Sequence, residues 1–361
     1  MSKFCVFCGE KPDKKTKEHI IPQWLIRLTG DPNRTISLGV NFNHIFETGD
    51  VDLNIRHFSF NSFQFPACSS CNNEYSELET NSSFVIKKIL AGDYINNNEI
   101  NTLLDWFDKV RIGLWLGSIT LDKIKNDVNP KFYINNRIGQ KDRALYVYKL
   151  SKASDGINFH GFNTPAFQFA PCVYGLRINN YFFINYSKDF LISENLGFPY
   201  FEYFDIDEDS RADVFNPKKG NNKITTPIIN TNFIKPSFTF YQAIIDSENL
   251  PQDFINNYVK SNMSDEYSNR SSIYYYSSNV KKILKLDEDD EIIVDGKIFN
   301  LELTSFNKKI TKNIIEELES IIKFNHHLKI ENKEKASIIE DNRKHILNLH
   351  RAVKKVLYEF M

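Results

Sequence analysis

The chain has almost no net charge and no long apolar run, and both shortages narrow what it can do. Its 45 Lys and Arg nearly balance 46 Asp and Glu, which gives a net charge of -1. Without a general basic field, any attraction to nucleic acid has to be local. No apolar stretch approaches the length of a membrane span, and no signal-peptide pattern precedes Cys5. We therefore expect a cytoplasmic protein with no membrane contact.

Glycine is also scarce, and the 14 glycines form none of the familiar glycine-dependent sites. There is no P-loop, no dinucleotide-binding fingerprint and no G-x-S-x-G nucleophile elbow. The remaining composition, 25% charged and 41% hydrophobic over 361 residues, is that of an ordinary globular protein. This length is enough for two domains or three.

Cysteine is rare too, but four of the five cysteines are arranged in two pairs. Cys5 and Cys8 form one C-x2-C pair, and Cys68 and Cys71 form the other. In a reducing compartment such pairs favour metal binding over disulfides, and four thiolates suit tetrahedral Zn²⁺. Cys172 stands alone and is expected to be a small buried side chain.

The hydrophobic pattern predicts an α+β protein in three segments. Residues 1–82 would form a zinc-knuckle module, 83–128 a helical connector, and 129–361 a larger mixed α+β region that ends in amphipathic helices. Within the first segment, residues 33–66 form a long insertion with strand-like stretches such as 57–60. Long insertions of this kind are usually functional or disordered.

Periodicity predicts several elements of the later segments. Residues 99–125 carry apolar side chains at helical spacing, as in a buried helix. Asp295 and Gly296 lie between two strand-like runs and predict a hairpin turn. From about residue 308 two apolar helical stripes follow, which either cover the β core or pair with a second chain. The other strand-like runs are 132–134, 144–148, 181–184 and 238–241.

Between the cysteine pairs lies an acid-histidine dipeptide, Glu18-His19, with Pro22 shortly after it. A neutral imidazole near pH 7 is a suitable general base for activating water. A carboxylate is a hard ligand for Mg²⁺, which needs few protein ligands because it keeps several waters. Asn72 directly follows Cys71 and offers a neutral carbonyl oxygen as a second hard ligand.

The order C-x2-C, Glu-His-x-x-Pro, C-x2-C-Asn resembles the HNH endonucleases, the zinc-stabilised branch of the ββα-metal (His-Me finger) nucleases. The resemblance covers residues 1 to about 80. It implies that His19 is the general base and that Glu18 and Asn72 bind a catalytic Mg²⁺ or Mn²⁺ ion. It also implies that the four paired cysteines hold a structural zinc ion.

The sequence departs from the family's pattern in three ways. Many members have Asp at the position of Glu18. The family's middle asparagine, which orients the base through its strand, usually precedes the second cysteine pair by a few residues. Asn61 is the nearest candidate here, and Asn54 is another. The insertion at 33–66 is also longer than in the minimal motif.

The resemblance implies a metal-dependent endonuclease that hydrolyses the phosphodiester bonds of DNA. By analogy of architecture it suggests a bacterial restriction or antiphage effector, whose C-terminal region binds DNA, a regulatory ligand or a partner protein. Cutting both strands needs two sites, so a homodimer through the C-terminal helices is a reasonable hypothesis. The alternative is a non-catalytic zinc ribbon that binds nucleic acid or a protein. In that case His19 is structural or a zinc ligand, and Asn72 caps the helix that follows.

Overall fold

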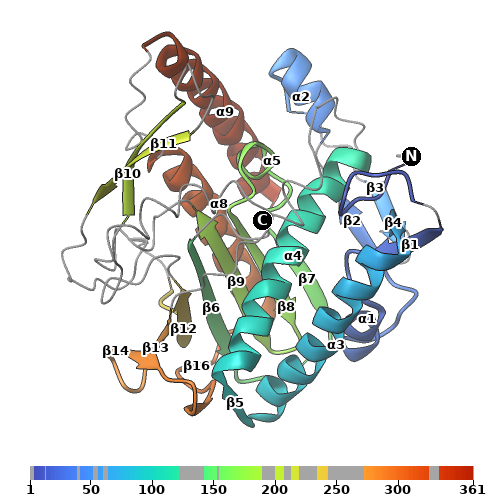
Figure 1. Ribbon diagram of the computed structural model, residues 1–361, viewed down its shortest axis with the longest axis vertical. Coiled ribbons are helices and arrows are strands. Elements are labelled where there is room, and N and C mark those ends of the chain that lie inside the picture. Colours follow the sequence, from blue (N-terminus) through green and yellow to red (C-terminus); the bar gives the residue numbers. More distant parts are fainter. Residues whose placement is uncertain are drawn as a thin grey trace.

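A computed structural model gives the arrangement of the chain (Figure 1). It describes residues 4–12, 14–38, 41–51, 56–59, 64–121, 142–152, 154–188, 200–206, 213–218, 234–242, 272–324 and 333–360. The predicted α+β class is confirmed, because helices and antiparallel sheets both make up the fold.

The elements follow one another from an N-terminal unit of short strands and helices to a sheet and two long helices. In chain order they are β1 (Lys15–His19), α1 (Gln23–Leu28), β2 (Thr35–Leu38), α2 (Phe42–Thr48), β3 (Arg56–Ser59), β4 (Gln64–Cys68), α3 (Ser69–Ala91), β5 (Tyr94–Asn96), α4 (Asn97–Leu121), β6 (Asp142–Leu150), β7 (Ile157–His160), α5 (Pro165–Phe169), β8 (Val173–Ile178), β9 (Tyr181–Lys188), β10 (Tyr200–Ile206), β11 (Asp213–Lys218), β12 (Phe238–Gln242), β13 (Ile273–Ser277), β14 (Ile283–Leu286), β15 (Glu291–Ile293), β16 (Ile298–Phe299), α8 (Leu303–Phe324) and α9 (Lys333–Phe360).

An eight-stranded sheet forms the centre of the molecule. Its strands run in the order β14-β13-β12-β6-β9-β8-β7, and β16 adds to β6 in parallel. The runs 144–148, 181–184 and 238–241 lie in β6, β9 and β12, so their prediction as strands is confirmed. The run 132–134 lies outside the described residues.

Helices cover both faces of this sheet, and the alternation of side chains along β9 shows how. Phe183 lies with its ring 5.2 Å from that of Phe107 on α4, and Asn185 also faces α4. Phe182 and Tyr186 point the other way and contact α8. Successive side chains of a strand point to opposite faces. The sheet therefore lies between α4 and α8, as Figure 1 shows.

The predicted hairpin at Asp295 and Gly296 is wrong. β15 pairs with β5 and β16 pairs with β6, so the two runs belong to different sheets. The glycine is required for another reason: a Cβ on Gly296 would lie 2.4 Å from the carbonyl oxygen of Ser237. A close approach between distant segments, rather than a turn, explains this glycine.

The C-terminal stripes have different surroundings. The α8 stripe, which includes Ile314, Leu318 and Ile322, is buried in the core that includes the sheet, as the first alternative predicted. On α9, Val353 is buried beside Ile45 of α2. Ile338 and Ile339 at the start of α9 are exposed, at 56% and 48%. Pairing with a second chain stays a prediction.

The N-terminal unit consists of an antiparallel strand pair followed directly by a helix. β1 pairs with β4 in a register that places Lys15 opposite Cys68 and His19 opposite Gln64, and α3 begins at the next residue. The insertion between the two strands holds α1, β2, α2 and β3. The predicted division after residue 82 falls inside α3, and one continuous apolar core runs from Cys5 to Leu347. Within the described ranges, no helix combines the length and the apolar character of a membrane span.

Candidate functional site

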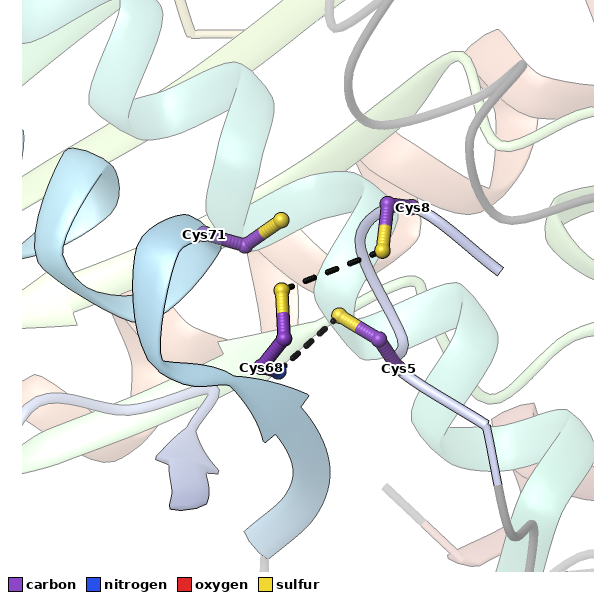
Figure 2. A group of neighbouring side chains, drawn as sticks. All are labelled: Cys5, Cys8, Cys68 and Cys71. Carbon is purple, nitrogen blue, oxygen red and sulfur yellow. Dashed lines mark hydrogen bonds between the residues drawn. The ribbon is translucent and has the colours of Figure 1, made fainter. Parts of the chain in front are cut away.

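The four paired cysteines meet at one point, as Figure 2 shows. Their Sγ atoms all lie within 4.8 Å of one another, and the sulfurs of Cys8 and Cys68 are 3.9 Å apart. A tetrahedron with zinc–sulfur bonds of about 2.3 Å has edges of about 3.8 Å. The cluster is therefore compatible with a zinc site, and Cys172, buried elsewhere, is the small core residue that was predicted.

Local backbone geometry builds this cluster. The first pair lies in a tight turn in which Gly9, at φ 74°, donates its N–H to the carbonyl oxygen of Cys5 at 3.0 Å. Val6 donates to the carbonyl oxygen of Pro66 at 2.8 Å, which joins this turn to β4. Cys68 ends β4 and donates its N–H to the Sγ atom of Cys5 at 3.3 Å. Strand pairing and the start of α3 therefore bring the two pairs together.

The pKa values of the thiols are shifted in opposite directions. Burial raises the pKa of the Cys68 thiol, but hydrogen bonds from Ser70 and neighbouring groups outweigh it and lower the pKa to about 6. Burial and the neighbouring thiols raise the pKa of Cys71 and of Cys8. Four thiolates repel one another, so a bound cation is what allows all of them to lose their protons together.

Glu18 points from β1 into the protein. Its side chain accepts a hydrogen bond from Lys109 Nζ at 2.6 Å, and the same nitrogen lies 2.5 Å from Glu79 Oε1. The residue is 6% exposed. Burial raises the pKa of Glu18 against the opposing effect of Lys109, and it raises the pKa of Glu79 to about 7. The Glu18 carboxylate is thus already paired with the Lys109 ammonium group of α4.

A small cavity lies beside this ion pair. Its walls are Glu18, Lys109 and apolar side chains that include Ile20 and Phe65, and its volume is about 10 Å³. A space of that size holds about one water molecule. It does not hold a divalent ion with its waters.

His19 points to the opposite side of the strand. Its Nε2 atom lies 2.7 Å from the amide nitrogen of Gln64 and 3.1 Å from that of Gln23. Burial, with a smaller effect of Lys17, lowers the pKa of His19, so the ring is neutral at pH 7. In this arrangement the amides donate to Nε2, and Nδ1 carries the proton. A half-turn of both amides would place their oxygens at Nε2–H as acceptors and free Nδ1 as a base.

Asn72 lies in the first turn of α3 and is partly exposed. The helix begins at Ser69 with Cys68 as its N-cap, so the alternative that Asn72 caps the helix is wrong. Asn72 lies on the same face of α3 as Glu79, the residue that contacts Lys109, but it is seven residues earlier. This separation corresponds to about 10 Å along the helix axis. No contact recorded among the described side chains joins Asn72 to Glu18 or His19.

The sequence identified some of the polar residues and missed others. Asn61 and Asn54 lie outside the described residues, so their assignment stays a prediction. Gln64 contacts the histidine instead, and its position four residues before Cys68 was a signal that could have identified it. Nothing in the local pattern around Gln23 or Lys109 indicated a role beside the site.

Comparisons of this chain with models of protein families, with curated proteins and with solved structures find no match.

Proposed function

We propose that the N-terminal module is a zinc-stabilised nuclease of the HNH type, with DNA as its substrate. The observation that carries the proposal is the local order of elements: an antiparallel strand pair, β1 and β4, runs directly into α3. The four cysteines gather at the Lys15 end of this pair, and a neutral histidine lies at its other end. The HNH resemblance of the motif implies the same arrangement.

In this proposal His19 takes a proton from water, and Gln64 holds the imidazole in place. General bases of this kind contribute about 10²–10⁴-fold to a rate, and they act best with a pKa near the working pH. The lowered pKa keeps His19 unprotonated at pH 7, as a base requires. The zinc ion would be held by the four thiolates and would fix the fold of the module without taking part in hydrolysis.

The residues assigned to a catalytic divalent ion do not fit that ion as they stand. Glu18 is bonded to Lys109, and the space beside it is too small for an ion with its waters. The same pairing favours the second candidate function, a zinc module that binds nucleic acid or protein without cutting it.

The test is nicking of supercoiled plasmid by the purified chain in Mg²⁺ or Mn²⁺, with and without EDTA. We expect His19→Ala to lower the nicking rate by at least about 100-fold without unfolding the protein. His345→Ala, at an exposed position of α9, is the matched control and should cut at the wild-type rate. Full activity of His19→Ala would remove His19 as the base. DNA binding without nicking in any metal would support the non-catalytic module.

A further inference from the structure

The outer face of the β1–β4 pair carries His19 and is open to solvent. Along β4, partly exposed side chains alternate with buried ones. On β1, Lys17 is exposed and His19 is partly exposed, while Glu18 between them is buried. Successive side chains of a strand point to opposite faces, so Lys17 and His19 share the outer face, about 7 Å apart along the strand. A cation and the histidine therefore stand next to each other on an accessible surface.

The ammonium group of Lys17 is available to a ligand. Its side chain forms no ion pair or hydrogen bond within the part of the chain that the structure describes. Its positive charge acts on the neighbouring ring, because it adds to burial, the larger cause, in lowering the pKa of His19. A lysine carries its charge on a flexible stem of four carbons, so the ammonium can follow an anion that lies over His19.

A second cation reaches this surface from α1. Gln23, whose amide nitrogen lies 3.1 Å from the Nε2 atom of His19, is the first residue of that helix. Arg27 follows four residues later, so it lies on the same helix face, about 6 Å further along the axis. Its side chain is exposed and, like that of Lys17, forms no ion pair with any described residue.

The charge around this surface differs from that of the rest of the module. Residues 10–27 include five Lys or Arg and three Asp or Glu, and one of these acids, Glu18, is buried and bonded to Lys109. The exposed side of α3 instead carries Glu74 and Glu77. Since the net charge of the whole chain is -1, a polyanion is attracted only where cations gather locally. The surface of β1 and α1 meets this condition, and the first turns of α3 do not.

The spacing of the two cations suits a phosphate backbone. Each strand of a DNA duplex carries one phosphate per about 3.4 Å of helix axis. Positions about 6–7 Å from the groups at the histidine therefore correspond to phosphates close to the one that His19 faces. Lysine and arginine bind phosphate oxygens, and such contacts position a nucleic acid without reading its bases.

We propose that Lys17 and Arg27 bind backbone phosphates of the DNA strand that passes His19, and that they do so independently of base sequence. The proposal rests on the proposed nuclease function, whose substrate it places along β1 and α1 rather than along α3. In this arrangement the two cations deliver a phosphodiester to the imidazole, and neither takes part in the hydrolysis.

The test measures binding of a short fluorescein-labelled DNA duplex to the zinc-loaded full chain by fluorescence anisotropy, without added Mg²⁺ or Mn²⁺. The variants are Lys17→Met, Arg27→Met and the double variant, which keep apolar stems at exposed positions. Arg27→Lys retains the charge. Lys285→Met is the matched control, because Lys285 is an exposed lysine on β14, at the other end of the central sheet. Circular dichroism and zinc content check that each variant is folded.

The readout is the slope of log K against log of the salt concentration between about 50 and 200 mM NaCl, since each phosphate contact contributes about 0.9 to its magnitude. We expect each Met variant to lower the slope by about 0.9 and the affinity at 0.1 M salt by roughly five- to ten-fold, with the two losses additive. Arg27→Lys and Lys285→Met should keep the wild-type slope. A duplex of unrelated sequence should show the same losses.

A double variant with the wild-type slope would overturn the proposal, because DNA would then bind to another surface. Losses that occur with one duplex sequence and not with the other would also overturn it, and so would a wild type that binds no DNA.

Plasmid nicking by the same proteins separates this proposal from the nuclease assignment. A fall in the slope without nicking by any of the proteins would leave the phosphate contacts standing and remove the nuclease. Nicking by the wild type, together with an unchanged slope in the double variant, would leave the nuclease standing and remove the contacts.

Discussion

Individual buried polar residues set how this protein responds to protons. His160 lies 2.8 Å from the hydroxyl of Thr311 through its Nδ1 atom. That hydroxyl donates to the carbonyl oxygen of Asn307, so it accepts from the ring. The other ring nitrogen is buried without a partner among the described groups. Burial, with a smaller effect of the charge on Arg177, lowers the pKa of His160 to about 4.

This shift predicts a loss of stability in mild acid. The unfolded chain takes up a proton at His160 near pH 6.5, but the folded chain does so only near pH 4. Stability from this residue is therefore complete above pH 6.5 and falls as the pH drops toward 4, by about 3 kcal/mol in total. Urea unfolding of the wild type and of His160→Asn over this pH range measures the difference between them.

Subtracting the variant is necessary because other groups act in the opposite direction. Burial raises the pKa of Glu317 well above its usual value and that of Glu79 to about 7, so both favour folding in acid. The two carboxyls are common to both proteins, and their effects cancel in the difference. A difference that stays constant from pH 7 to pH 4 would contradict the assignment.

Gln64 supports a second prediction at the level of the residue. Gln64→Leu removes the closer of the two amides at the Nε2 atom of His19 but keeps a similar volume. We expect the nicking rate to fall by about ten-fold, the smaller end of the effect of removing a hydrogen-bond partner that orients a functional histidine. The pH–rate profile should move as well, because the ring loses a partner that fixes its tautomer.

A purely structural role would lower the rate without moving the profile. Gln64→Asn is the informative companion, since the shorter amide keeps the chemistry and should recover part of the rate. Nitrogen-15 shifts of the His19 ring report the tautomer independently of any nuclease activity. Identical ring shifts in the wild type and in Gln64→Leu would contradict the positioning role.

At the scale of elements, local periodicity predicted where the helices lie, but contacts between distant segments could not be predicted from the sequence. The helix predicted at 99–125 is observed as α4 at 97–121, because its buried apolar residues repeat at helical spacing. The charges on that helix gave no comparable signal. Lys109 bonds to Glu18, which is 91 residues away in the chain, and no local pattern predicts this pairing. The polar contacts that the sequence did not predict therefore join different elements, because such contacts leave no local pattern.

Gly296 is a second residue whose role depends on a contact between distant segments, and substitutions at this position can test that role. As the central residue of a hairpin turn it would have a positive φ, which asparagine tolerates better than alanine. At a close approach to the Ser237 carbonyl, any side chain clashes, and the larger one is worse. We expect Gly296→Ala to lower the free energy of unfolding by about 2 kcal/mol and Gly296→Asn by more.

Thermal and urea unfolding of both variants distinguish the two explanations. Asp295→Ala changes the neighbouring exposed residue and should alter stability by less than about 0.5 kcal/mol. If Gly296→Asn were as stable as the wild type, the clash with Ser237 would not be the reason for the glycine.

At the scale of the whole molecule, the cluster of four cysteines joins two segments that are far apart in the chain. Cys5 and Cys8 lie before β1, Cys68 is the last residue of β4, and Cys71 lies in the first turn of α3, so the cluster closes the insertion between the strands into a loop. The sequence was enough to identify all four cysteines of the cluster, because the spacing within each pair is local. It could not show that the module shares one continuous apolar core with the sheet.

The last prediction follows from these two facts. Cys68→Ser should lower the zinc content from one ion per chain to near zero, because three thiolates hold the ion far less well than four. The turn at Cys5–Gly9 and the pairing of β1 with β4 should then exchange their amide hydrogens at least ten-fold faster. Amides of β6, β8 and β9 should stay protected, since their sheet is covered by α4 and α8 on both faces.

Cys172→Ser, at a buried cysteine outside the cluster, is the control and should retain zinc. Hydrogen exchange read by mass spectrometry, with metal analysis of the same samples, makes the comparison. A variant that keeps its zinc would contradict the four-thiolate site, and uniform loss of protection across the sheet would show that the module and sheet unfold as one unit.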